Sequence, residues 1–195
     1  SDVCSSDLAL AGAPELAHYV FDDQGHVRKH VAVFINQTMV QDRQNLNQML
    51  ASGDKVLVIS CSTGATLATW LGVNGQNAQV AGHVFVSPNF GPKDKRAEII
   101  NGPWGQQIAF ALQGENRGRP AESPAEEGAW TNSYPTRALF PMMALVQGVR
   151  DSELSAFRTP LLVLYSEQDH TVEPAQTKAA FARLGSANKQ LQVVD

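Results

Sequence analysis

The chain has 195 residues, of which 43% are hydrophobic and 17% charged, and its formal net charge is −4. This length suits one domain or part of a larger one, and the acidic balance gives no electrostatic argument for nucleic acid or a membrane surface as partner. No apolar run approaches the roughly 20 residues of a membrane span. The cysteines, Cys4 and Cys61, and the five histidines show no zinc or disulfide spacing, so we expect no metal and no other cofactor.

Residues 1–8 read Ser-Asp-Val-Cys-Ser-Ser-Asp-Leu and resemble the translated frame of a sequencing adapter. They include neither an initiator Met nor the basic, apolar and small-residue regions of a signal peptide. We expect this octapeptide to lie outside the fold and the chain to be an open-ended fragment. A disordered tail is the alternative.

The next segment predicts a helix end at 14–21, a turn at 22–25 and a strand at 30–36. The order Glu-Leu, Phe-Asp-Asp-Gln-Gly, Val-Arg-Lys-His-Val-x-Val-Phe-Ile-Asn and Gly-Asp-Lys-Val over residues 9–58 resembles the ubiquitin-like β-grasp sulfur carriers, such as the small subunit of molybdopterin synthase. Those carriers work through a free C-terminal Gly-Gly, whereas this chain runs on through Ser62. The resemblance therefore implies a carrier fragment that could not act as a carrier.

The most informative stretch joins a strand, a sharp turn and a helix. The run 55–59, with four apolar residues after Lys55, predicts a strand buried on both faces, small residues follow at 60–64, and 65–71 has helical spacing. Ser62 lies at the apex of the turn, in the pattern Ser-x-Ser-x-Gly. This arrangement resembles the nucleophile elbow of the α/β-hydrolases, which has Gly at the first position, and Ser-Thr-Gly-Ala-Thr-Leu-Ala resembles their carboxylesterase and lipase-like members.

Two neighbours of Ser62 have different expected roles. The resemblance implies that the main-chain N–H of Thr63 donates to the oxyanion. Cys61 is an alternative nucleophile, but only the apex side chain of an elbow reaches the substrate. We therefore predict that Cys61 is a small buried hydrophobe.

The two resemblances meet near residue 54. We expect a β-grasp-like fragment at 9–53 and an α/β-hydrolase fragment at 54–195, joined as a chimera at a shared Gly-Asp-x-Val-type entry into a strand. A genuine fusion is one alternative. The other is that residues 9–52 are an unusual helix and strand of the hydrolase itself.

A further buried strand is predicted at 79–88, and a segment rich in Gly, Pro, Trp and Asn follows. Its position matches the helical cap that α/β-hydrolases insert before the strand that carries the acid, so we expect a cap at about 90–157. Apolar residues recur at helical spacing over 139–146. We predict that Met142, Met143, Trp104 and Trp130 pack in the core of this region.

The run 161–165 predicts another buried strand, and its loop resembles the acid loop of the hydrolase family. Asp169 matches the triad acid, which orients the catalytic imidazole. Glu167 is the second candidate. Glu173 is predicted to start a helix beside a proline, and His170 to be a loop residue.

An amphipathic helix is predicted at 175–184 and a last strand at 190–195. In the α/β-hydrolases the triad order is Ser, acid, His, and the His follows this last strand. We therefore expect the catalytic His to be missing, together with the loop that supplies the second oxyanion amide.

The fold class expected is α/β: a partial α/β-hydrolase with a mostly parallel sheet and a cap, after a partial β-grasp-like segment. The function that the resemblance implies is ester hydrolysis through an acyl-enzyme, with Ser62 and Asp169 as catalytic residues and a small acyl ester as substrate. We expect this chain to be inactive as it stands. The alternatives are a sulfur-carrier fragment and a non-catalytic hydrolase homologue. Thioesterase, amidase or lactonase chemistry, the oligomeric state and the compartment stay open.

Overall fold

The computed structural model describes residues 31–36, 38–39, 41, 53–77, 80–118, 120–121, 123–124 and 132–194. The adapter-like octapeptide, the predicted helix at 14–21 and most of the β-grasp-like segment lie outside these residues. The proposed join near residue 54 therefore stays a prediction.

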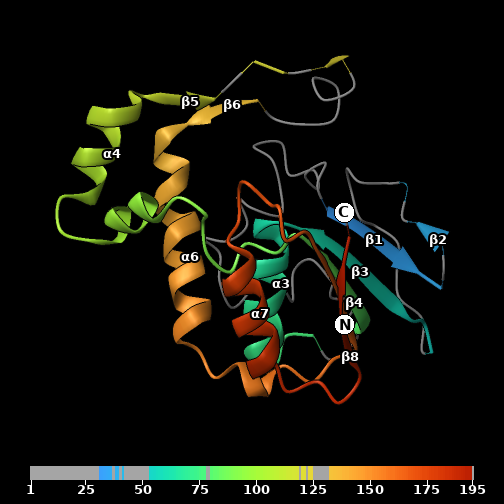
Figure 1. Ribbon diagram of the computed structural model, residues 1–195. Helices are drawn as coiled ribbons and strands as arrows, with labels where there is room; N and C mark the ends of the chain where they lie inside the picture. The colour runs from blue at the N-terminus through green and yellow to red at the C-terminus, as the bar shows by residue number, and fades with distance from the viewer. Residues whose placement is uncertain are drawn as a thin grey trace, which may run out of the picture.

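A six-stranded sheet forms the centre of the fold, in the order β2-β1-β3-β4-β7-β8 (Figure 1). Strands β3, β4, β7 and β8 run parallel, whereas β1 runs antiparallel to both β2 and β3. This is the mostly parallel sheet that the sequence predicts, with antiparallel strands at one edge. The strands are β1 (Val31–Ile35), β2 (Thr38–Met39), β3 (Val56–Cys61), β4 (Val80–Val86), β7 (Leu161–Tyr165) and β8 (Lys189–Val193).

Three helices lie together beside the sheet: α3 (Thr63–Val73), α6 (Leu139–Asp151) and α7 (Pro174–Arg183) (Figure 1). The short 3-10 helix η4 (Leu154–Ala156) contacts α3 and α7. The core between these helices and the sheet buries mostly aliphatic and aromatic side chains. They are Ala65, Leu67, Ala68, Phe85, Phe90, Leu145, Val149, Leu154, Phe157, Leu161, Val163, Ala180 and Leu184. Among the described helices, none is both long and apolar enough to cross a bilayer.

Both ends of α7 are capped by side chains. The carboxylate of Glu173 accepts the main-chain N–H of Ala175 at 3.2 Å, which confirms the predicted helix start. At the other end, Lys189 Nζ donates to the carbonyls of Phe181 at 2.8 Å and Leu184 at 2.5 Å. A cation at this end also complements the helix dipole.

Strand β3 is not buried on both faces, as the sequence predicts. Ser60 is 2% exposed, but Leu57 is 38% exposed and Val58 and Ile59 are half-buried. Adjacent residues of a strand point to opposite faces, and the core helices cover the face of Ser60. The helices in the described ranges cover the face of Leu57 less completely than the face of Ser60. The apolar run by itself therefore predicts more burial of this strand than the structure has.

The region between β4 and α6 extends away from the sheet (Figure 1). It comprises η2 (Lys95–Asn101), α4 (Gly105–Gln113), the strand pair β5 (Asn116–Gly118) and β6 (Ser133–Pro135), and η3 (Thr136–Ala138). Arg150 of α6 joins it to the core through an ion pair of 2.6 Å with Glu98. Helix α6 packs against α3, so this part of the expected cap belongs to the core layer.

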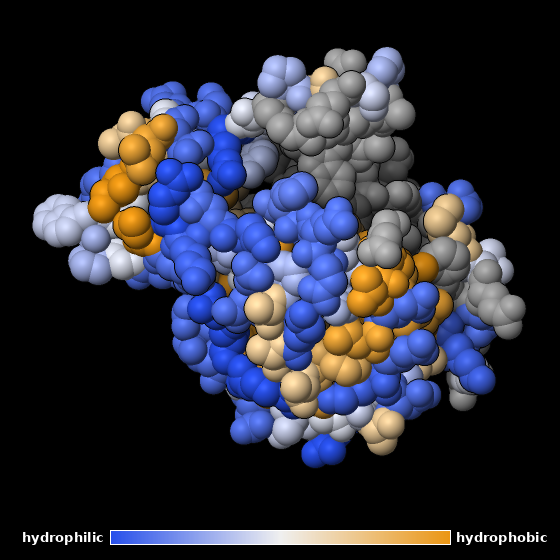
Figure 2. All heavy atoms as spheres, viewed as in Figure 1, coloured by the Kyte–Doolittle hydropathy of each residue, from blue (hydrophilic) through white to orange (hydrophobic). Residues whose placement is uncertain are grey.

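Apolar side chains gather on the surface of η2 and α4 (Figure 2). Ile99, Ile108, Phe110 and Leu112 are 48%, 39%, 40% and 75% exposed. This clustering fits the apolar character expected of a cap. The cap boundaries stay a prediction.

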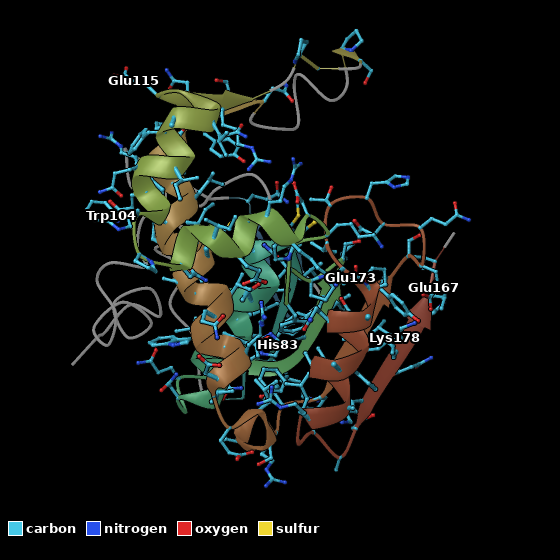
Figure 3. The ribbon with its side chains drawn as sticks, turned by 60° about the vertical axis from the view of Figure 1, so that its left-hand side comes forward. His83, Trp104, Glu115, Glu167, Glu173 and Lys178 are labelled. Carbon is cyan, nitrogen blue, oxygen red and sulfur yellow. The ribbon has the colours of Figure 1, made fainter. Side chains whose placement is uncertain are left out.

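The prediction that Trp104 packs in a core is wrong. Trp104 is 74% exposed and lies at the outer end of α4, far from His83 in the core (Figure 3). It precedes α4 with a left-handed backbone (φ 66°), and the next residue, Gly105, packs so tightly on the carbonyls of Ile99 and Ile100 that a Cβ there would clash. This tight turn directs the indole outward. Met143, by contrast, is fully buried as predicted, Met142 is half-buried, and Trp130 lies outside the described residues.

Candidate functional site

Ser62 lies between β3 and α3 with a strained backbone. Its φ is 50° and its ψ is −120°, a combination that a non-glycine residue adopts rarely and at a cost of about 1–3 kcal/mol. The Ser62 N–H donates to the carbonyl of Val86 at 2.9 Å, which ties the turn to β4. Its side chain makes no capping bond to α3, although Ser is a preferred capping residue. The hydroxyl is therefore free for another role.

The strand register places the turn at one edge of the sheet. Cys61 pairs with Val86, and Val86 pairs with Leu164, so that these residues lie level across β3, β4 and β7. Ser62 is then level with Tyr165, about 10 Å away across two strand spacings. Because the three strands are parallel, the loops after them meet at the same edge, where α/β folds bind ligands.

Asp169 lies in the loop after β7, at this edge. Its Oδ1 accepts the main-chain N–H groups of Thr171 at 2.7 Å and Val172 at 2.9 Å. Burial, and then the negative charge of Asp169, raise the pKa of the Cys61 thiol. The Asp169 loop and the Ser62 turn follow strands that end at the same edge of the sheet. Cys61 itself is a free, half-buried thiol, less buried than predicted.

Glu167, the second candidate acid, has other partners. It accepts hydrogen bonds from Lys178 Nζ at 2.9 Å and from the Tyr165 hydroxyl at 2.8 Å. Figure 3 shows Glu167 and Lys178 together at the outer side of α7. The bonds from Lys178 and Tyr165 hold the pKa of Glu167 below its usual range. Glu167 belongs to a surface ion pair.

The described residues include two histidines, and the strand register places His83 out of reach of Ser62. His83 is 4% exposed and packs against the rings of Phe85 and Phe157, at centroid distances of 5.5 Å and 5.3 Å. It pairs with Val58, four residues before Ser62, which corresponds to about 13 Å along the strand. His170 is an exposed loop residue, as predicted.

The loop after β4 contacts both the Ser62 turn and the Asp169 loop. Asn89 bonds to the turn through its main chain and its side chain. Gly91 accepts the N–H of Glu173 at 2.9 Å, and the N–H of Lys93 donates to Thr171 at 3.0 Å. Sequence reasoning missed this connection. The Ser-Pro-Asn-Phe-Gly-Pro run signals a turn, but no local pattern shows which distant residues a turn will bond.

Among the described residues, no group of three or more His, Cys, Asp and Glu side chains gathers where it could hold a metal ion.

No protein-family model matches this chain, and no curated protein does. Its fold is similar to several solved structures. A monoacylglycerol lipase of Paleococcus ferrophilus matches with a TM-score of 0.53 and 13% identity, over 71% of this chain and 57% of the lipase. A soluble variant of monoglyceride lipase from Saccharomyces cerevisiae, in complex with a substrate analogue, matches with a TM-score of 0.51 and 13% identity, over 69% of this chain and 51% of the lipase. A structure from work on the metagenome-derived lipolytic enzymes LipS and LipT matches with a TM-score of 0.50 and 15% identity, over 71% of this chain and 54% of that chain.

The chain has part of an α/β-hydrolase fold. It spans a little over half the length of these structures. The predicted α/β fold class, part of an α/β-hydrolase with a mostly parallel sheet, is confirmed, whereas the β-grasp-like segment stays a prediction. Within this hydrolase fold, the structure brings Ser62, Thr63 and Asp169 to one edge of the sheet and leaves Glu167 in a surface ion pair.

Proposed function

We propose that this chain carries the acyl-transfer site of a serine esterase. Ser62 is the nucleophile, Asp169 is the acid that orients the base, and the main-chain N–H of Thr63 donates to the oxyanion. The observation that carries the proposal is the backbone of Ser62, which is strained and presents an uncapped hydroxyl where parallel strands end. Strain of this kind persists where function requires it.

The proposed reaction has two steps. The Ser62 Oγ attacks the ester carbonyl carbon while a base takes the hydroxyl proton, and the tetrahedral intermediate then expels the alcohol, which leaves with that proton. Water next hydrolyses the acyl-enzyme. Thr63 opens α3, where a main-chain N–H has no partner in its own helix, so it can donate to the negative oxygen.

An ester substrate is favoured by the names of the similar structures, which include two monoacylglycerol or monoglyceride lipases. Because the fold alone does not decide the chemistry, the ester is part of the proposal. An acyl ester of a small alcohol is the simplest probe of it.

We further propose that the base is not supplied by the described residues, since His83 lies in the core and His170 in an exposed loop. Loss of a triad member lowers turnover by about 10⁴- to 10⁶-fold. Without a base at Ser62, the chain should therefore hydrolyse p-nitrophenyl butyrate very slowly by itself.

Added imidazole tests the nucleophile, because it can replace a missing histidine base. The hydrolysis of p-nitrophenyl butyrate is measured at increasing imidazole with the unaltered chain and with Ser62→Ala, which reports the reaction of imidazole alone. Ser87→Ala is the matched control, since Ser87 also has a left-handed backbone (φ 42°) and follows the neighbouring strand. We expect the rate above this imidazole background to rise with imidazole in the unaltered chain and in Ser87→Ala, and to be absent in Ser62→Ala. Equal rates for the unaltered chain and Ser62→Ala would exclude Ser62 as the nucleophile.

A further inference from the structure

Asn89, in the loop after β4, makes hydrogen bonds to the Ser62 turn and to α3. Its main-chain N–H donates to the carbonyl oxygen of Ser62 at 3.1 Å, and its own carbonyl accepts the Thr66 hydroxyl at 2.6 Å. Its side-chain Nδ2 reaches the Thr63 hydroxyl at 3.4 Å. One residue, 27 positions along the chain from Ser62, thus contacts three positions of the turn and of the first part of α3.

The bond to the Ser62 carbonyl bears directly on the oxyanion donor. The Ser62 carbonyl and the Thr63 N–H belong to the same peptide group, which is planar and trans, so that the two point in opposite directions. A donor that fixes the carbonyl therefore also fixes the direction of the N–H. The same carbonyl accepts the N–H of Ala65 at 3.1 Å, but that bond is local to the helix.

Burial of the Asn89 side chain is unfavourable for folding. Asn89 is 5% exposed, and within the described part of the chain its Oδ1 is buried without a hydrogen-bond partner. A buried acceptor without a partner disfavours folding, and such groups are few in native structures. A purely structural role would not require an amide here, because a smaller side chain would leave no acceptor unsatisfied.

The far end of the same loop is anchored as well. Lys93 bonds to the main chain of Thr171, which itself donates to Asp169, and Gly91 bonds to that of Glu173, next to the other donor, Val172. Gly91 also packs against Gln176 so closely that a Cβ would lie 2.8 Å from its Cγ. The loop that carries Asn89 is therefore also hydrogen-bonded to the acid loop, so the position of Asn89 does not depend on the Ser62 turn alone.

We propose that Asn89 is a positioning residue that orients the Ser62–Thr63 peptide, and with it the oxyanion-binding N–H, through its bonds to the Ser62 carbonyl and the Thr63 hydroxyl. This rests on the proposed function of Ser62 as nucleophile. Asn89 itself does not touch the substrate.

Kinetics with added imidazole give the first test. Asn89→Ala and Thr63→Val each break the side-chain bond, whereas Thr63→Ser keeps the hydroxyl. Asn74→Ala is the matched control, because it removes an asparagine bond at the other end of α3.

We expect kcat of the Ser62-dependent reaction to fall about tenfold in Asn89→Ala and Thr63→Val, with KM within about twofold. The double variant should be no slower than either single one, because both remove the same bond. Thr63→Ser, which keeps the hydroxyl, should lose less kcat than Thr63→Val, and Asn74→Ala should keep the original kcat.

Amide hydrogen exchange gives the second test, and it does not depend on activity. The N–H groups of residue 89 and Ala65 both bond to the Ser62 carbonyl, so they should exchange about tenfold faster in Asn89→Ala and Thr63→Val but not in Thr63→Ser or Asn74→Ala. If these exchange rates are unchanged, or if kcat falls equally in Asn74→Ala, the role of Asn89 is refuted. If Ser62→Ala keeps all activity while the exchange rates change as expected, only the nucleophile assignment fails.

Discussion

The main-chain N–H of Asn89 and the carbonyl oxygen of Ser62 lie 3.1 Å apart, and this bond joins the loops after two neighbouring parallel strands. It places the residue with the strained backbone and the loop that reaches Asp169 in one hydrogen-bonded unit. Substitutions around Asn89 should therefore differ in whether they lower the free energy of unfolding or the rate of the Ser62-dependent reaction.

The Thr66 hydroxyl is hydrogen-bonded to the main chain of Asn89. It is fully buried and donates to the Asn89 carbonyl at 2.6 Å. We expect Thr66→Val to lower the free energy of unfolding by about 1–2 kcal/mol, since it leaves that carbonyl without this donor. Thr69→Val is the control, because Thr69 is equally buried but donates within the helix to Ala65, whose carbonyl can keep its main-chain partner. Urea unfolding of both variants measures the difference, and equal losses would contradict the prediction.

His83 should make stability depend on pH. Burial lowers the pKa of His83 to about 4, below its ordinary value of 6.5, and both ring nitrogens are buried without a partner among the described residues. Between those two values the unfolded chain binds the proton and the folded chain does not, so stability is full above pH 6.5 and falls as the pH drops toward 4. We expect about 2 kcal/mol to be lost through His83 between pH 7 and pH 5.

The measurement is urea unfolding at both pH values for the unaltered chain and for His83→Leu. The substitution should remove this part of the pH dependence, whatever the carboxylates contribute. The same pH dependence in both chains would show that His83 is not buried in its neutral form.

Gly72 and Gly148 are helical glycines with opposite surroundings. A Cβ on Gly72 would lie 2.4 Å from the ring of Phe157, whereas nothing lies within 4 Å of a Cβ on Gly148. Gly72→Ala should destabilise by about 1–3 kcal/mol, because overpacking exceeds the gain in helix propensity. Gly148→Ala should stabilise by up to about 1 kcal/mol. Thermal or urea unfolding distinguishes them, and effects of the same sign would contradict the packing of α3 on Phe157.

Asp169 and Glu167 should differ in catalysis. With imidazole as the added base, we expect Asp169→Asn to lower the Ser62-dependent rate by about tenfold or more, because the carboxylate orients the imidazole and stabilises its cation. Glu167→Gln should change that rate little, since Glu167 is bonded to Lys178 and Tyr165. A larger loss in Glu167→Gln would exchange the two assignments.

The sequence by itself determined the elements near the site. A run of apolar residues, a cluster of small ones and a helical spacing predict β3, the turn at Ser62 and α3, because each pattern reflects the period of the local backbone. For the same reason the strand before Asp169 and the helix start at Glu173 are predicted correctly.

Only the tertiary structure decided what these elements contact. Hydrogen bonds such as Asn89 to Ser62 or Glu167 to Lys178 depend on strand register and helix placement, which leave no local signal in the sequence. The exposure of one face of β3 and the exposure of Trp104 have the same physical reason, because an apolar side chain is buried only if another element covers it. Local patterns therefore placed Ser62 at the apex of its turn, and long-range packing decided which loops hold that turn in place.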